Sequence, residues 1–94
     1  MARRRHLIAY DIADERRLRR VVKVMESYGE RLQYSVFLCD MSPGGLARWR
    51  SEILDVIDLS VDSVVVIDVG SPGQEDLTVI GAPRTLPRSG AMIV

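Results

Sequence analysis

The residue best placed for chemistry is Asp11, a single carboxylate at the end of the apolar run from Leu7 to Ile12. Aspartate is depleted in strands because its short polar side chain competes for backbone hydrogen bonds, so its position here calls for a reason. Strand ends are where sheets often present chemical groups. Two interpretations stand: Asp11 turns to solvent or caps the following loop, or it is a functional group.

Basic side chains share one face of the helix that we predict over residues 15–28. They are Arg16, Arg19, Arg20 and Lys23, with Arg17 on the flank. Like charges at this spacing repel each other, and an anionic partner would offset the repulsion. The alternative is an ordinary solvated face, since arginine and lysine are good helix formers and Glu26 and Glu30 neutralise part of the charge.

A carboxylate beside a basic surface suggests Mg²⁺-assisted phosphodiester chemistry, in which arginines hold a nucleic-acid backbone and the metal polarises the phosphoryl group or activates a water. One aspartate provides too few ligands for this. A two-fold axis near Asp11 would supply a second carboxylate from a partner chain, and Mg²⁺ needs few protein ligands because it keeps most of its water. The residues therefore suggest a metal site shared by a homodimer.

Several other kinds of site have no counterpart in the sequence. It contains no nucleophile elbow, Gly-rich phosphate loop, Rossmann fingerprint or His-x-x-His pattern. Cys39 is the only cysteine, which excludes an internal disulfide and a cysteine zinc site and fits a reducing compartment. The single histidine, His6, has no pairing partner in the sequence, so a general-base role for it is a minor alternative.

The charge of the chain is zero in total but unevenly distributed. Residues 1–50 hold eleven basic and six acidic side chains, whereas residues 51–94 hold two basic and seven acidic ones. A neutral total argues against indiscriminate coating of nucleic acid, but a basic stripe still suits a phosphate backbone. The apolar run after the basic N-terminus is too short for a signal peptide or a membrane span, so we expect a cytoplasmic protein with no membrane association.

Apolar periodicity predicts the elements that would position these residues. The predicted strands are 7–12, 31–40, 61–69 and 77–80, and the predicted helices are 15–28 and 43–58. Asp14 and Ser42 are suited to the N-caps of the helices, and Gly29 to a left-handed C-cap. The helical stripe that contains Trp49 should face the core, with base stacking as the alternative role of that ring.

Two of the predicted strands carry further information. Residues 31–40 are long for one strand, so we expect a bend or bulge near residues 33–35 to divide them in two. Residues 61–69 are β-branched almost throughout, which predicts a central strand.

This order of elements is typical of an α+β, ferredoxin-like fold, βαββαβ plus a short extra C-terminal strand, with both helices on one face of an antiparallel sheet. The other face would be bare, so we expect a dimer that closes two such faces together. We assign residues 1–82 to this domain and residues 83–94 to a tail. The apolar end of the tail, residues 92–94, either frays or pairs with a sheet edge of the partner subunit.

Two stretches resemble the family of CRISPR-associated endoribonucleases, the smaller of the two core proteins of spacer acquisition. They are Tyr10-Asp11-Ile12, followed by Asp14 and the Arg-rich helix, and Tyr28-Gly29-Glu30-Arg31-Leu32-Gln33-Tyr34-Ser35-Val36-Phe37. The resemblance covers about residues 7–40. The string Tyr-Gly-x-Arg-x-Gln-x-Ser-Val-Phe is its most specific part.

The resemblance implies a homodimer in which Asp11 faces its symmetry mate and binds a divalent metal. It implies hydrolysis of RNA or DNA in some members, whereas others act as a structural bridge that holds DNA between dimers of the larger CRISPR integrase subunit. Arg20 and Arg31 fall where members carry basic residues linked to activity. Leu38 departs from the family pattern, in which an acidic residue is common at that place.

The leading hypothesis is thus a Mg²⁺-dependent nuclease dimer in CRISPR adaptation, with Asp11 as metal ligand and catalytic residue and with Arg16, Arg20 and Arg31 binding phosphates. The second hypothesis is a non-catalytic DNA-binding subunit of the spacer-integration complex. Without the resemblance, a ferredoxin-like regulatory module that binds a small metabolite is a third, but the Gly-rich ligand loop it would need is missing.

Overall fold

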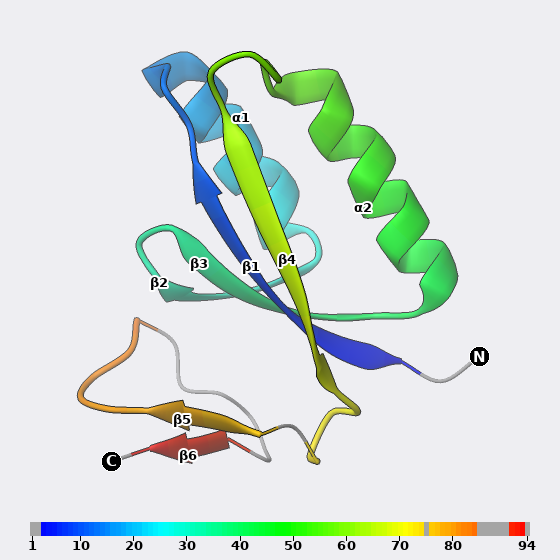
Figure 1. Cartoon of the computed structure of the whole chain (residues 1–94), viewed down its shortest axis with the longest axis vertical. Coiled ribbons are helices and arrows are strands. Elements are labelled where there is room, and N and C mark those ends of the chain that lie inside the picture. The colour runs from blue at the N-terminus through cyan, green and yellow to red at the C-terminus, as the bar shows by residue number, and fades with distance from the viewer. Residues whose placement is uncertain (1–2, 75, 85–90, 94) are drawn as a thin grey trace.

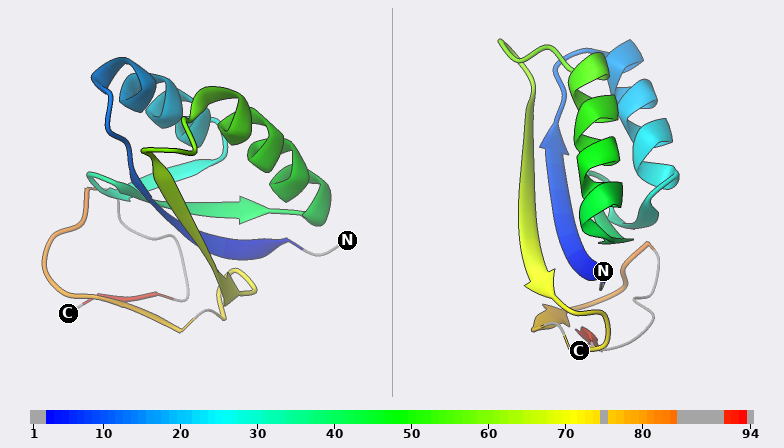
Figure 2. Two further views of the ribbon diagram at one scale, coloured as in Figure 1. Left: turned by 45° about the horizontal axis from the view of Figure 1, so that its top comes forward. Right: turned by 90° about the vertical axis from the view of Figure 1, so that its right-hand side faces the viewer.

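Two helices pack on one face of a four-stranded antiparallel sheet in the computed structural model, which describes residues 3–74, 76–84 and 91–93 (Figure 1). In chain order the elements are β1 (Arg4–Asp11), α1 (Glu15–Glu26), β2 (Gly29–Gln33), β3 (Val36–Met41), α2 (Pro43–Val56), β4 (Ser63–Gly70), β5 (Leu77–Val79) and β6 (Ala91–Ile93). The sheet order is β2-β3-β1-β4, and Figure 2 shows both helices on the same side. The predicted ferredoxin-like α+β fold is therefore confirmed.

The helix starts follow the predicted caps. The Asp14 carboxylate accepts a hydrogen bond from the backbone N–H of Arg17 at 3.0 Å, and the Ser42 hydroxyl accepts one from Gly45 N–H at 3.1 Å. Each cap satisfies an amide that has no partner within its helix. In the part of the chain that the structure describes, neither helix has the length and apolar character of a membrane span.

The predicted role of Gly29 as a helix C-cap is wrong. Helix α1 ends at Glu26 with Ser27 as its C-cap, and Gly29 is the first residue of β2. A side chain at this position would collide with the carbonyl oxygen of Leu38 and would lie 2.8 Å from Cys39 Cα. Glycine is needed here because two strands approach closely, not because a helix ends.

The predicted division of residues 31–40 is confirmed. The chain turns at Tyr34 and Ser35, which places β2 and β3 side by side as an antiparallel hairpin. The pairing shifts between Arg31 and Gln33, where β2 carries an irregularity. Arg31 and Tyr34 of this hairpin line a groove together with residues of α1.

The predicted central position of the β-branched strand is wrong. Strand β4 lies at an edge of the sheet and pairs with β1 alone among the described strands. The strand is β-branched because both of its faces are apolar, not because both of its edges are paired. Val64 packs on the core under the helices, and Val65, on the other face, is 54% exposed. Apolar faces and paired edges are separate properties of a strand.

The core lies between the helices and the sheet and combines residues from both layers. Its buried members are Ile8, Tyr10, Val21, Met25, Phe37, Cys39, Met41, Trp49 and Ile53. Trp49 is 3% exposed, and its indole nitrogen lies 3.1 Å from the Met25 sulfur. The predicted core role of this tryptophan is confirmed, and its burial excludes the alternative of base stacking.

The end of the chain follows neither predicted alternative within the part that the structure describes. Residues 91–93 form β6, which pairs in parallel with β5 of the same chain. Residues 85–90 and 94 lie outside the described residues, so the proposed boundary between domain and tail stays a prediction.

Candidate nucleic-acid groove and metal residue

Asp11 is the last residue of β1 and lies opposite Ser63, the first residue of β4. Its side chain is exposed, whereas the preceding Tyr10 is buried under the helices. Because neighbouring side chains in a strand point to opposite faces, Asp11 lies on the face that no helix covers. The structure thus places this carboxylate at a strand end, on the open face of the sheet.

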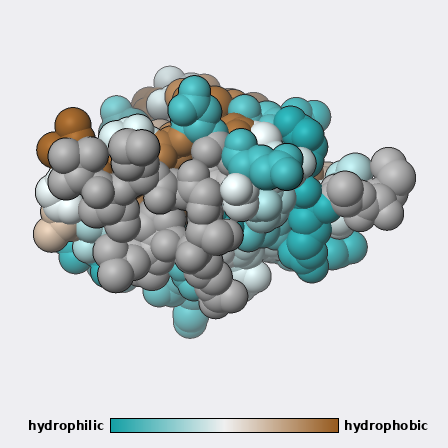
Figure 3. Space-filling view, turned by 90° about the horizontal axis from the view of Figure 1, so that it is seen from below, coloured by the Kyte–Doolittle hydropathy of each residue, from teal (hydrophilic) through white to brown (hydrophobic). Residues whose placement is uncertain are grey.

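Apolar side chains share the open face with Asp11. Ala9 lies opposite Val65, and Leu7 lies opposite Ile67, which is 48% exposed. Figure 3 views the molecule from the end that carries β5 and β6, and hydrophobic residues appear among hydrophilic ones along its upper edge. An apolar surface of this kind marks an interaction site more often than a solvated one.

The residues present fit a divalent metal only if more than one chain contributes. Within the described residues, no three histidine, cysteine or acidic side chains gather into a group that could hold an ion. Asp11 offers a carboxylate, the type of ligand that Mg²⁺ prefers, and Mg²⁺ retains several waters. At this place, one chain thus supplies one carboxylate ligand among the described residues.

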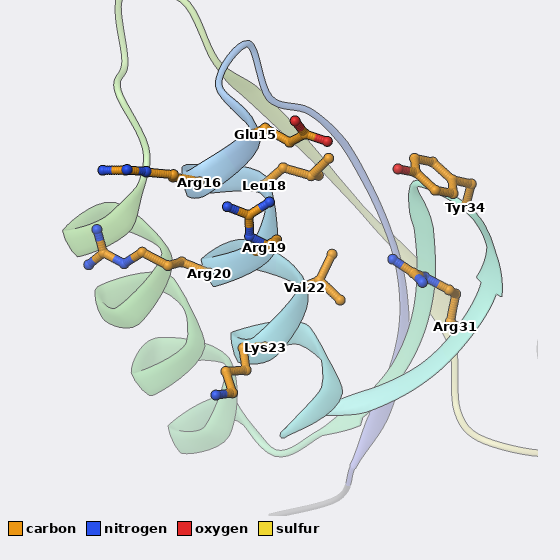
Figure 4. A pocket seen from close by; sticks show the side chains of 9 residues that line it. All are labelled: Glu15, Arg16, Leu18, Arg19, Arg20, Val22, Lys23, Arg31 and Tyr34. Carbon is orange, nitrogen blue, oxygen red and sulfur yellow. The ribbon is translucent and has the colours of Figure 1, made fainter.

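A groove of about 770 Å³ lies between α1 and the β2–β3 turn. Five of its nine lining residues are basic and one is acidic, so its field favours anions. The lining residues are Glu15, Arg16, Leu18, Arg19, Arg20, Val22, Lys23, Arg31 and Tyr34 (Figure 4).

The three arginines predicted to bind phosphates all line this groove but form two groups. Arg16 and Arg20 extend together from α1 on the side where α2 lies, whereas Arg31 reaches across from β2 (Figure 4). Arg19 lies between the two groups in the same view. All of them are on the helix side of the sheet, so within one chain the groove and Asp11 belong to opposite faces.

The prediction missed Arg19 and Tyr34 as groove residues. Arg19 belonged to the recognised basic face, and its helical position, one residue from Arg20, gave no reason to choose between them. Tyr34 is an aromatic residue in a turn between two strands, which was the available signal for an exposed ring. Its exposure of 58% distinguishes it from Phe37, which is 1% exposed.

Arg31 is half-buried and held by aromatic rings. Its guanidinium carbon lies 5.4 Å from the centre of the Tyr34 ring and 5.6 Å from that of Phe37. Its Nη2 lies 3.5 Å from the Tyr10 hydroxyl, and its Nε is buried with no hydrogen-bond partner among the described residues. No carboxylate forms an ion pair with it in the described part of the chain. Stacking fixes this cation and leaves its charge available to a phosphate.

Arg17, on the flank of the same helix, is instead paired with Asp62. Its Nε and Nη2 donate to the two carboxylate oxygens at 2.8 and 3.1 Å. The Asp62 side chain is fully buried and also accepts hydrogen bonds from the backbone N–H groups of Ala13 and Asp58 at 2.8 and 2.9 Å. These bonds, above all the one from Arg17, hold the pKa of Asp62 well below its ordinary value. The pair fixes the loop that follows Asp11.

The remaining reactive side chains are poorly placed for catalysis. Cys39 is buried, and burial raises the pKa of its thiol to about 12, which keeps it protonated near neutral pH. His6 is 5% exposed and lies opposite Cys39 in the sheet. Neither side chain is presented to solvent, so a general-base role for His6 has no structural support.

Comparison with known proteins finds related sequences along most of the chain. The sequence model of the family described as CRISPR associated protein Cas2 matches residues 4–76. The CRISPR-associated endoribonuclease Cas2 1 of Rhodospirillum rubrum is 40% identical over 92 residues, which are 95% of this chain and 89% of that protein. The CRISPR-associated endoribonuclease Cas2 of Chlorobaculum tepidum is 34% identical over 93 residues, 94% of this chain and 97% of that one.

A solved structure shares both fold and sequence with the chain. The crystal structure of a hypothetical protein from Thermus thermophilus superposes with a TM-score of 0.82 at 31% identity, covering 93% of this chain and all of that one. The family match spans both Asp11 and the basic groove. The chain therefore belongs to the CRISPR-associated Cas2 family.

Proposed function

We propose that two copies of this chain form a metal-dependent endonuclease that hydrolyses phosphodiester bonds of RNA or DNA in CRISPR adaptation. The observation that carries the proposal is the exposed Asp11 on the bare apolar face of the sheet. The names of the relatives from R. rubrum and C. tepidum, both endoribonucleases, support the nuclease activity.

The bare sheet face supports a homodimer. Val65 and Ile67 of β4 are about half exposed there, and covering them with a second sheet would remove apolar surface from water. In a symmetric dimer the same patch serves both subunits. A two-fold axis near the end of β1 brings the two Asp11 side chains close together.

The residues of the chain divide the work of hydrolysis. When bound, a divalent cation such as Mg²⁺ polarises the scissile phosphoryl group and lowers the pKa of a water. The two Asp11 carboxylates would hold it. Arg31, fixed by its aromatic neighbours, binds one phosphate in the groove, and Arg16 and Arg20 bind the backbone along α1. These arginines hold the nucleic acid on the helix side of the sheet and do not touch the phosphate at Asp11. The Arg17–Asp62 pair keeps the Asp11 loop in place.

The experiment compares cleavage by the wild type, by Asp11→Asn and by Asp55→Asn, which alters an exposed acid on α2. Each protein is incubated with single-stranded RNA and with duplex DNA, with and without Mg²⁺. We expect Mg²⁺-dependent cleavage that falls at least about 100-fold in Asp11→Asn and is unchanged in Asp55→Asn. Undiminished cleavage by Asp11→Asn would exclude Asp11 as the metal ligand.

A second candidate function is a non-catalytic DNA-binding subunit that joins the larger CRISPR integrase subunit. The basic groove favours it, because phosphate binding there needs no metal. For this function, salt-dependent duplex binding without cleavage is expected. That binding should survive Asp11→Asn and weaken in Arg16→Ala and Arg20→Ala.

A further inference from the structure

Tyr34 is an exposed aromatic side chain on a fixed support. The residue is 58% exposed at the β2–β3 turn, and its ring lies at one wall of the groove (Figure 4). Its carbonyl oxygen accepts a hydrogen bond from the Tyr10 hydroxyl at 3.1 Å, and the next carbonyl, of Ser35, accepts one from Tyr10 N–H at 3.1 Å. The turn is therefore attached to the residue that precedes Asp11, and the ring is held in place while remaining open to solvent.

Two guanidinium groups lie over this ring without covering it. The guanidinium carbon of Arg31 is 5.4 Å and that of Arg84 is 5.7 Å from the ring centre, and Tyr34 as a whole remains 58% exposed. The backbone N–H of Arg84 donates to the carbonyl of Leu32 at 3.0 Å, which holds this part of the chain at the end of β2. Aromatic rings and planar guanidinium groups are the surfaces on which proteins stack unpaired bases.

The simpler explanation, that Tyr34 serves only to hold Arg31, leaves its exposure unexplained. Phe37 is buried and already lies 5.6 Å from the same guanidinium carbon. Tyr34 is more than half exposed, so its ring offers a contact surface to a ligand in addition to any support it gives to Arg31. The groove in front of it, about 770 Å³, is within the size range of small-molecule sites and has cationic walls.

We propose that Tyr34 is the stacking platform for one unpaired nucleobase, so that the groove selects single-stranded over duplex nucleic acid. This inference rests on the proposed nucleic-acid function. The base lies on the Tyr34 ring, and the adjoining phosphates lie on Arg19 and Arg31. A base inside a duplex has both faces occupied and reaches such a ring only after unstacking, which costs free energy.

Fluorescence anisotropy with labelled oligonucleotides tests the platform. Single-stranded RNA, single-stranded DNA and the corresponding duplex are titrated with the wild type, Tyr34→Ala, Tyr34→Phe and, as a control outside the groove lining, Leu59→Ala, a residue that is 74% exposed. We expect Tyr34→Ala to weaken single-strand binding about 5- to 100-fold and duplex binding less than about twofold. Tyr34→Phe keeps the ring and should bind like the wild type.

A fluorescent adenine analogue in the single strand reports stacking directly. Its fluorescence should fall on binding to the wild type and Tyr34→Phe but not on binding to Tyr34→Ala. Wild-type affinity of Tyr34→Ala for single strands overturns the platform but leaves the proposed function standing. If Tyr34→Ala weakens the binding of single strands and duplex equally, the platform is also overturned, because that result indicates that Tyr34 only holds Arg31. Failure of the wild type to bind either polymer overturns both.

Discussion

The two flanks of α1 use arginine in opposite ways. Arg17 is paired with the buried Asp62, whose carboxylate accepts hydrogen bonds from Arg17 Nε and Nη2 and from two backbone N–H groups. Arg16, its neighbour in the sequence, lines the groove together with Arg20, and neither has an ion-pair partner in the described part of the chain. Adjacent arginines of one helix can therefore have different roles. An arginine that meets a buried acid stabilises the fold, whereas one that meets no acid is available to bind a ligand.

The largest expected effect is the loss of stability in Asp62→Asn. The substitution removes the negative charge that Arg17 pairs with and weakens the acceptor of two backbone amides in a fully buried position. We expect the urea midpoint to fall by about 1 M or more. Asp55→Asn, at an exposed position of α2, is the control and should unfold like the wild type. Equal midpoints for both variants would show that the Arg17–Asp62 pair does not hold the fold.

The next largest effect is on nucleic-acid binding by the double variant Arg16→Ala/Arg20→Ala. We expect affinity at low salt to fall about tenfold and the slope of log K against log[salt] to lose about two units, because each arginine releases roughly one counterion. The urea midpoint should stay unchanged. Arg17→Ala should behave in the reverse way, with lower stability and an unchanged salt slope. If the slope of log K against log[salt] became flatter in Arg17→Ala, Arg17 would also contact phosphates, and the two flanks of α1 would not differ in function.

Acid should remove the stabilisation that the Arg17–Asp62 pair provides. In the folded chain, hydrogen bonds hold the pKa of Asp62 below its ordinary value of 3.8, with Arg17 as the main cause. The unfolded state therefore binds more protons at low pH, so this stabilisation is complete above about pH 4 and is lost as the pH falls further. Urea unfolding followed from about pH 6 to pH 2 should show that loss. Asp62→Asn should show a smaller pH dependence, and an identical one would contradict the prediction.

The smallest expected effect belongs to Glu15, the one acidic residue that lines the groove. Its charge opposes phosphate binding, so Glu15→Gln should bind nucleic acid about twofold more tightly at low salt and equally at high salt. Glu26→Gln, which changes an exposed acid at the other end of α1, is the control. Weaker binding by Glu15→Gln would indicate that this side chain itself contacts the nucleic acid.

Local signals in the sequence predicted most of the fold. The caps at Asp14 and Ser42, the hairpin within residues 31–40 and the apolar face of α1 each depend on neighbours a few residues away. What the sequence could not predict depends on distant contacts. Gly29 is required because β3 lies too close for a side chain at this position. The edge position of β4 depends on which strands the whole sheet contains.

The candidate site was predicted only in part for the same reason. The basic face of α1 follows from helical spacing. The pairing of Arg17 with Asp62 does not, because Asp62 is 45 residues away in the sequence. The separation of Arg31 from Arg16 and Arg20, and the exposure of Tyr34, appear only when β2 is folded against α1. The face on which Asp11 lies was not predicted either, because it is set by the packing of Tyr10 under the helices.

The central claim, that two copies of Asp11 share one cation, is tested most directly by the stoichiometry of metal binding. Titration calorimetry with Mn²⁺, a divalent ion that takes the same oxygen ligands, counts the ions bound per chain. The account predicts one ion for every two chains of the wild type and none for Asp11→Asn. One ion per single chain, or equal binding by Asp11→Asn, would contradict it.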